Sequence, residues 1–250
     1  MSCEDRIYEE NTNKQGLKMK IIEYRTCSDI DVIFDDGNII NTRYDHFKEG
    51  SVKNPYFPSV LGIGYIGNTV TIDDNKKPLK SYTIWKGMLQ RCYDSKSTSY
   101  KKYGGDGVTV CEEWKCYAIF KEWYDEHYYE VNNEKMAIDK DILNKGNKIY
   151  SPKNCMIVPE RINSLFTKRA SKRGNYPIGV AKGSGKKYVV RFSINDKLTT
   201  IGSYTTPEEA FYAYKEAKEK EIKRVADKYK DKIPQKLYEA MYNYEIEIDD

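Results

Sequence analysis

The chain lacks the features that place a protein in a membrane or in an oxidising compartment. Its 250 residues contain no apolar run close to the roughly 20 residues that a membrane-spanning helix needs. Residues 1–6 do not have the basic-then-apolar pattern of a secretory signal. The six cysteines follow no disulfide-framework spacing, so we expect thiols. The sequence therefore predicts a cytoplasmic protein that does not contact a membrane.

Histidine is also scarce, since the chain has only His46 and His127. The hydrophobic fraction of 39% is modest and the charged fraction of 32% is high, which favours small modules over one deep core. Tyrosine, in contrast, occurs 23 times. Its ring can pack while its hydroxyl stays wet, so it suits small cores and polar interfaces.

The net charge of +4 conceals an uneven distribution. Residues 168–203 hold nine Lys or Arg against one acid, Asp196, whereas residues 233–250 have a net charge of −4. Such a local excess attracts polyanions, although a charge run can also be an ordinary solvated face. The candidate DNA-binding residues are Lys168, Arg169, Lys172, Arg173, Lys182, Lys186, Lys187, Arg191 and Lys197.

The first third of the chain predicts a flexible N-terminus over residues 1–17 and then a β-rich, SH3-like unit over residues 18–75. Strands are expected at 20–24, 30–34 and 39–40, because β-branched and aromatic residues concentrate there. The sequence Asp35-Asp36-Gly37 is a strong hairpin signal between the last two.

Residues 81–167 predict a separate domain. Aromatic and apolar residues recur at helical spacing on both sides of a glycine-rich turn, and such stripes are typical of a core. Two short strands at 136–139 and 156–158 and a helix from about 159 to 166 follow.

The last third predicts a basic linker at 168–177, a module at 178–232 and an acidic tail at 233–250. The module reads as a three-stranded meander with turns at 183–185 and 195–196. Thr206, Pro207 and Glu209 then form the capping box of a helix. A stripe of Ala and Tyr would let this helix lie close against the sheet.

This module resembles an AP2 domain. The resemblance rests on Gly179-Val180, on Tyr188-Val189-Val190-Arg191 and on the segment 201–214, which contains Ile201-Gly202-Ser203-Tyr204 and Glu208-Glu209-Ala210. It implies a sheet that lies in the DNA major groove, with Arg, Lys and aromatic side chains of the open face on bases and phosphates. The expected partner is double-stranded DNA. A protein-binding meander is the alternative.

The pleat of the second strand refines this expectation. Alternation places Lys187 and Arg191 on the open face and Tyr188 against the helix. With a single Arg in these strands, we expect Lys contacts to phosphates more than reading of bases.

A second resemblance covers residues 81–166, which are similar to HNH-type endonucleases of phages and their AP2-bearing relatives. It rests on Arg91-Cys92-Tyr93, Val110-Cys111-Glu112-Glu113-Trp114, Asp139-Lys140-Asp141, Ser151-Pro152, Asn154-Cys155, Val158-Pro159 and Ile162-Asn163. The resemblance implies a ββα-metal fold with an Asp-His pair at the end of the first strand, a loop Asn, a helical His or Asn, and one Mg²⁺ or Mn²⁺ ion.

The candidate catalytic residues depart from that pattern at one position. Asp139 matches the Asp, but Lys140 stands where the general-base His belongs, and a Lys with its ordinary pKa is protonated. Asn147 or Asn154 is the candidate loop Asn, Asn163 the helical residue, and His127 the substitute base.

The candidate metal ligands are Asp139, Asp141 and Asn163. The alternative is an eroded site in which Asp139, Asn154 and Asn163 only organise the loop through hydrogen bonds. A zinc site is not expected, because Cys111 and Cys116 are too far apart for the usual pairing and buried thiols account for Cys92 and Cys155.

The sequence thus predicts an α+β protein with a β-rich N-terminal unit, an HNH-like middle domain and an AP2-like C-terminal sheet and helix. It is interpreted as a phage or mobile-element DNA-binding protein of the host cytoplasm with a degenerate nuclease site. Two alternatives stay open: an active metal-dependent homing endonuclease or nickase, and an inhibitor that binds a host protein, for which the acidic segment 239–250 could serve. The DNA site and oligomeric state are left open.

Overall fold

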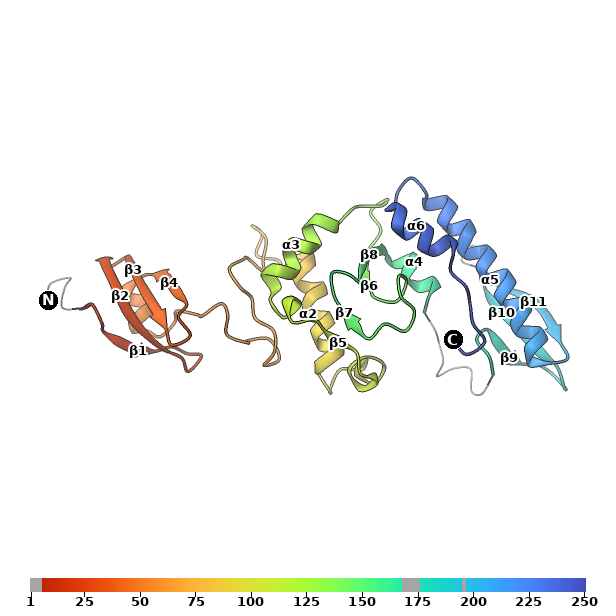
Figure 1. Cartoon of the computed structure of the whole chain (residues 1–250), viewed down its shortest axis with the longest axis horizontal. Helices are drawn as coiled ribbons and strands as arrows, with labels where there is room; N and C mark the ends of the chain where they lie inside the picture. The colour runs from red at the N-terminus through yellow and green to blue at the C-terminus, as the bar shows by residue number, and fades with distance from the viewer. Residues whose placement is uncertain (1–5, 168–175, 195–196) are drawn as a thin grey trace. The chain divides into compact units, whose positions relative to one another are not determined.

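The computed structural model describes residues 6–167, 176–194 and 197–250. It mixes helices and strands and divides into two compact units, residues 1–125 and 126–250 (Figure 1). The division lies inside the domain that the sequence predicts at 81–167, so that boundary differs from the expected one. No described helix is long and apolar enough to cross a membrane.

The first unit begins with a four-stranded antiparallel sheet in the order β1-β2-β3-β4. Alternate residues of β2 and β3 point to one face, where Ile21, Ile30 and Val32 are fully buried together with Phe47 of a short helix. Gly37 has a φ of 83°, as the expected hairpin turn requires. The elements are β1 (Glu10–Thr12), β2 (Lys18–Thr26), β3 (Asp29–Phe34), β4 (Ile39–Thr42) and α1 (Tyr44–Lys48).

Strand β1 corrects the prediction of a flexible start over residues 1–17 for its described part, whereas residues 1–5 lie outside the described residues. Glu10 lies opposite Lys20 of β2, so this segment is the edge of the sheet. Asn13 is buried, and its side-chain amide donates to the backbone oxygen of Val52 at 2.9 Å. Buried polar groups need such partners, and this one fixes the segment that follows β1.

The aromatic stripes of the first unit form its second core, as predicted. Trp85, Trp114, Tyr117 and Phe120 are fully buried, and the Trp85 indole donates to the Trp114 backbone oxygen at 2.7 Å. The elements are α2 (Lys80–Tyr93), η2 (Tyr100–Lys102), η3 (Gly104–Asp106), β5 (Thr109–Val110), η4 (Glu113–Lys115) and α3 (Tyr117–His127).

The second unit opens with the predicted order of strand, loop, strand and helix. Strand β6 (Met136–Asp139) pairs antiparallel with β8 (Met156–Pro159), and α4 (Glu160–Leu165) follows directly. The short strand β7 (Ile149–Tyr150) lies in the loop between them and was not predicted.

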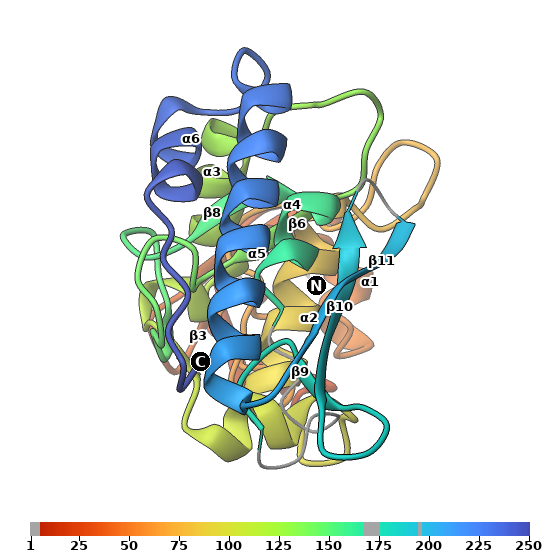
Figure 2. The ribbon, with the colours of Figure 1, turned by 90° about the vertical axis from the view of Figure 1, so that its right-hand side faces the viewer.

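A three-stranded antiparallel sheet and a long helix come next, again as predicted. The sheet has the order β11-β10-β9, and Figure 2 shows α5 running beside it. Thr206 and Glu209 form the expected reciprocal capping box at the start of α5. The elements are β9 (Val180–Lys182), β10 (Tyr188–Ile194), β11 (Lys197–Tyr204) and α5 (Pro207–Tyr229).

One hydrophobic core joins the parts of the second unit that the sequence assigns to separate domains. Val158 and Ile162 of the ββα element belong to the same buried cluster as Val190 and Ile222 of the sheet-helix module. The predicted acidic tail also belongs to it, because helix α6 (Gln235–Tyr242) and Ile246 contribute buried apolar side chains. Residues 233–250 are therefore part of the core and not a free tail.

Candidate nucleic-acid interface

The sheet β9–β11 has one packed and one open face. Val180 and Val190 are buried, and the Phe192 ring meets that of Tyr214 of α5 edge-on at 5.6 Å. Gly179 lets the chain enter β9 close to the helix. Its φ is 78°, and a side chain there would start 2.1 Å from the Tyr214 ring.

The open face carries Arg191, which is exposed and lies opposite Thr200. Two pairs further along, on the same face, exposed Ser193 lies opposite Leu198, whose exposed fraction is 73%. Lys187 is also exposed, and Tyr188 packs partly against the core. The exposure of Arg191 and the partial burial of Tyr188 agree with the expected facing of these two side chains, whereas Lys187 precedes β10.

A β-bulge interrupts the pairing of β10 with β11 between Val190 and Arg191. Val190 lies opposite Gly202 and Arg191 opposite Thr200, so Ile201 is the extra residue of β11. Bulges increase the local twist and re-aim the neighbouring side chains. The open face around Arg191 is therefore twisted.

Positive charge concentrates on the sheet and not on the helix that covers it. Residues 176–204 contain five Lys or Arg against one acid, and the five cations are exposed. Helix α5 is long and highly charged, but its six Lys or Arg are balanced by six Asp or Glu. The five exposed cations are Lys182, Lys186, Lys187, Arg191 and Lys197.

The remaining candidate DNA-binding residues, Lys168, Arg169, Lys172 and Arg173, lie outside the described residues.

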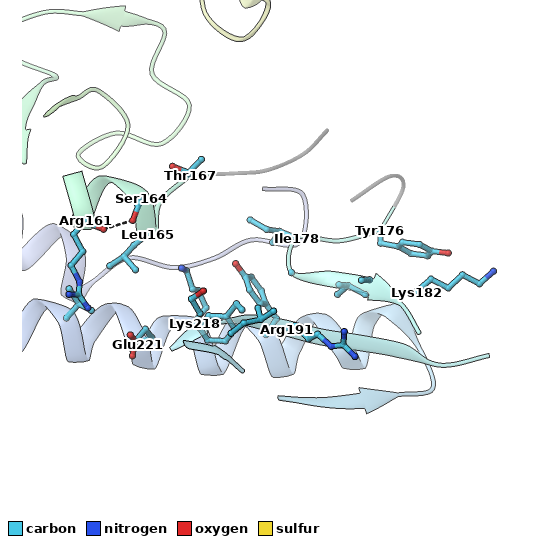
Figure 3. Close-up of a pocket in the computed structure, with 18 residues that line it drawn as sticks. Arg161, Ser164, Leu165, Thr167, Tyr176, Ile178, Lys182, Arg191, Lys218 and Glu221 are labelled. Carbon is cyan, nitrogen blue, oxygen red and sulfur yellow. Dashed lines mark hydrogen bonds between the residues drawn. The ribbon is translucent and has the colours of Figure 1, made fainter. Parts of the chain in front are cut away.

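A cavity of about 650 Å³ is lined by residues of α4, β9, β10 and α5 (Figure 3). Arg161 and Lys218 line it and were missed by the sequence analysis, because neither belongs to a basic run. Figure 3 shows Arg161, Lys218, Arg191 and Lys182 spread along the cavity, so their charges do not converge on one point.

The loop after β6 is organised around the ammonium group of Lys140. The side chain of Lys140 is only 9% exposed. Its Nζ donates to both carboxylate oxygens of Asp141 at 2.8 Å and to the backbone oxygen of Asn147 at 2.6 Å. In return, the Asn147 side-chain amide donates to the backbone oxygen of Lys140 at 3.0 Å. Residue 140 therefore bridges the two ends of the loop.

Asp139 ends β6 as a half-buried turn-forming residue. Its Oδ1 accepts the backbone N–H groups of Asp141 at 2.8 Å and Ile142 at 2.7 Å. Burial raises the pKa of its carboxyl group, and these two hydrogen bonds oppose the shift only in part. One oxygen of the Asp139 carboxyl group is thus engaged in hydrogen bonds to the loop backbone.

The two candidate loop asparagines bond to each other. The Asn154 amide donates to Asn147 Oδ1 at 3.1 Å, and Asn154 Oδ1 accepts from Asn144 at 3.3 Å. The structure therefore joins Lys140, Asp141, Asn147 and Asn154 in one hydrogen-bond network.

Asn163 and His127 lie on other elements. Asn163 is half-buried in α4. His127 is the last residue of α3, and its Nδ1 lies 3.9 Å from a carboxylate oxygen of the adjacent Glu126. Its side chain is 49% exposed, as is usual at a helix end.

The donor set fits a divalent metal ion poorly. Both oxygens of Asp141 already bind a fixed positive charge, and one oxygen of Asp139 is used by two backbone donors. An ammonium group within 2.8 Å of a ligand carboxylate repels a second cation. The side chains of Asp139, Asp141 and Asn163 consequently do not fit a Mg²⁺ or Mn²⁺ ion.

The described cysteines are free thiols, and Cys92, Cys116 and Cys155 are buried. Burial raises the pKa of the Cys111 thiol to about 11, so it stays protonated at neutral pH.

Comparisons with protein-family models, with curated proteins and with solved structures each found no match to this chain.

Proposed function

We propose that this chain binds double-stranded DNA through the open face of β9–β11. The observation that carries the proposal is the separation of charge within the sheet-helix module. The sheet segment has five exposed cations, whereas the helix behind it has no net charge. A neutral helix that supports a basic sheet segment, with cations at the turn, at the strand ends and at Arg191, is suited to a polyanion.

The composition of the open face favours contacts to the DNA backbone. Lysines at the turn and the strand ends would neutralise phosphates, and the hydroxyls of Ser193, Thr200 and Ser203 can donate to phosphate or sugar oxygens. The major groove admits a two-stranded β-ribbon, and Arg191 is the side chain suited to a guanine edge. We therefore expect DNA binding that has a modest sequence preference and depends strongly on salt concentration.

We further propose that the ββα element supports the sheet and does not cleave DNA. Lys140 occupies the general-base position as a hydrogen-bonded ammonium ion, and Asp139 is bound to the backbone. These contacts favour the degenerate site over the active nickase. The cores of the two elements are continuous, which is consistent with a supporting role.

Duplex binding measured against salt concentration tests the proposal. We expect Lys186→Ala/Lys187→Ala to weaken binding and to reduce the slope of log K against log[salt] by about two. Lys220→Ala is the control, because Lys220 is also exposed but lies on the helix α5 and not on the sheet. Salt-independent binding, absent binding, or an equal loss in the control would overturn the proposal.

A plasmid-nicking assay with Mg²⁺ or Mn²⁺ separates this proposal from the nuclease alternative. We expect wild type to leave supercoiled plasmid intact under conditions where it binds the duplex. Nicking that disappears in Asp139→Ala would instead establish the nickase and would contradict the supporting role of the ββα element.

A further inference from the structure

The N-terminal β-unit holds a cation between two tyrosine rings. The guanidinium carbon of Arg6 lies 4.2 Å from the centre of the Tyr44 ring and 5.3 Å from that of Tyr24. The two rings meet edge-on with their centres 5.6 Å apart. One guanidinium nitrogen of Arg6 donates to the Tyr24 hydroxyl at 2.8 Å. These are the contacts by which aromatic side chains recognise a guanidinium group.

The rings are fixed by the fold and not by Arg6. Tyr24 belongs to β2, and Tyr44 begins α1 and stacks on Phe47, which is fully buried. The Tyr44 hydroxyl donates to Glu9 at 3.0 Å, and the other oxygen of that carboxylate pairs with Lys48 at 3.2 Å, so both neighbours hold the Tyr44 ring in place. Two aromatic faces and one hydroxyl acceptor therefore stay in place when the occupant leaves.

The charge of this unit is opposite to that of the sheet β9–β11. Residues 6–52 contain seven Lys or Arg and nine Asp or Glu, a net charge of −2. A net negative charge favours a cationic segment of a protein over nucleic acid as the partner of this unit.

We propose that the Tyr24–Tyr44 site binds an arginine side chain of a partner protein, and that Arg6 is an internal ligand which the partner's arginine replaces. The planar guanidinium group suits the site better than an ammonium group, because it can lie over Tyr44 while it donates to Tyr24. Arg6 precedes the first backbone hydrogen bond to β2, which the Tyr8 N–H donates to the Ile21 oxygen at 2.8 Å, so the Arg6 side chain can leave without breaking the sheet.

An internal ligand acts as a competitor at high effective concentration. The site of the intact chain is therefore masked, and a partner must supply further contacts or displace the segment that carries Arg6. Removal of the Arg6 side chain should expose the site. This activity is independent of DNA binding, since it uses other residues of another unit.

Titration of the full chain with a blocked Gly-Arg-Gly tripeptide, followed by the NMR signals of the Tyr24 and Tyr44 rings, tests the proposal. We expect Arg6→Ala to bind the peptide roughly tenfold more tightly than wild type, because millimolar internal competition is lost. Arg43→Ala is the matched control: Arg43 is exposed and pairs with Asp45 at 2.9 Å. It should bind as wild type does. Adding Tyr44→Leu to Arg6→Ala should abolish binding.

Two results would overturn the proposal: a folded Arg6→Ala chain without saturable shifts of both rings, or equal binding of a blocked Gly-Lys-Gly tripeptide. If Arg6→Ala does not fold, the wild-type chain decides the question through the Arg6 side-chain Nε signal. Saturating arginine peptide must shift this signal to the position of a solvated arginine, and an unchanged signal contradicts the displacement.

Discussion

Lys140 illustrates how one residue redirects the chemistry of a loop. An ammonium group at the end of β6 contacts a carboxylate and a backbone oxygen from the far side of the loop. Three oxygen acceptors around one buried cation resemble the environment of a bound ion, but this cation is covalently part of the chain. The loop therefore has its own fixed positive charge.

Lys140→Ala should lower the free energy of unfolding by about 1–3 kcal/mol, because the half-buried Asn147 oxygen loses its charged donor. Lys153→Ala is the matched control, since Lys153 is an exposed residue of the same loop. Urea unfolding measures both. Equal stability of the Lys140 variant and wild type would show that the network contributes nothing.

Asp139 makes stability depend on pH in a direction that is unusual for an acid. Its pKa is raised by burial, so the folded state holds the proton more tightly than the unfolded chain does. Stability therefore falls as pH rises from the ordinary value near 3.8 towards the raised pKa, and is constant above it.

Asp139→Asn removes this titration and can keep the oxygen that accepts the two backbone N–H groups. Between pH 3 and pH 7, wild type should lose stability relative to the variant, as measured by melting temperature at each pH. The comparison cancels the titration of all other groups. A constant or inverted difference over this range would contradict the raised pKa.

At the scale of elements, the approach of β9 to α5 depends on a residue without a side chain. Gly179→Ala should destabilise the fold by about 3 kcal/mol, because left-handed backbone strain adds to a clash with the Tyr214 ring. Gly185→Ala is the control: its φ is 65°, but its added carbon meets open space. It should lose only about 1 kcal/mol. Equal losses in the two variants would exclude the clash as a cause.

Individual elements were predictable where local chemistry decides them. Thr206, Pro207 and Glu209 determine the start of α5 by capping, and Gly37 determines a hairpin turn. Strand β1 was missed because Glu10-Asn11-Thr12 has no apolar alternation. Only its pairing with β2 makes it a strand.

At the scale of the whole molecule, the C-terminal segment belongs to the core of the second unit. Leu237 and Met241 are fully buried, and the Ile246 backbone N–H donates to Glu219 of α5 at 2.8 Å. The negative charge of this segment conceals these apolar anchors. Glu239 and Glu245 lie between these anchors along the sequence, and three further acids follow Ile246.

Truncation after residue 233 should therefore destabilise the second unit strongly. Removal of two fully buried large apolar side chains costs about 2–5 kcal/mol each, which is comparable to the whole stability of a domain. Truncation after Glu247 is the control, because it keeps α6 and Ile246. Circular dichroism melting compares the two, and an unchanged melting temperature of the shorter chain would restore the free-tail interpretation.

The sequence by itself determined most helices and strands, the charge asymmetry, and the facing of Arg191 and Tyr188, because these follow from periodicity, capping and the pleat. Through the resemblance to HNH-type endonucleases, it also led us to expect that Lys140 stands where those enzymes have a histidine. Only the tertiary structure decided what that lysine does, since its partners, the Asn147 oxygen and the Asp141 carboxylate, are set by loop closure. The shared core of α4, the sheet, α5 and α6, and the site that Arg6 occupies between Tyr24 and Tyr44, likewise depend on contacts between residues far apart in sequence. Local propensity carries no information about such contacts.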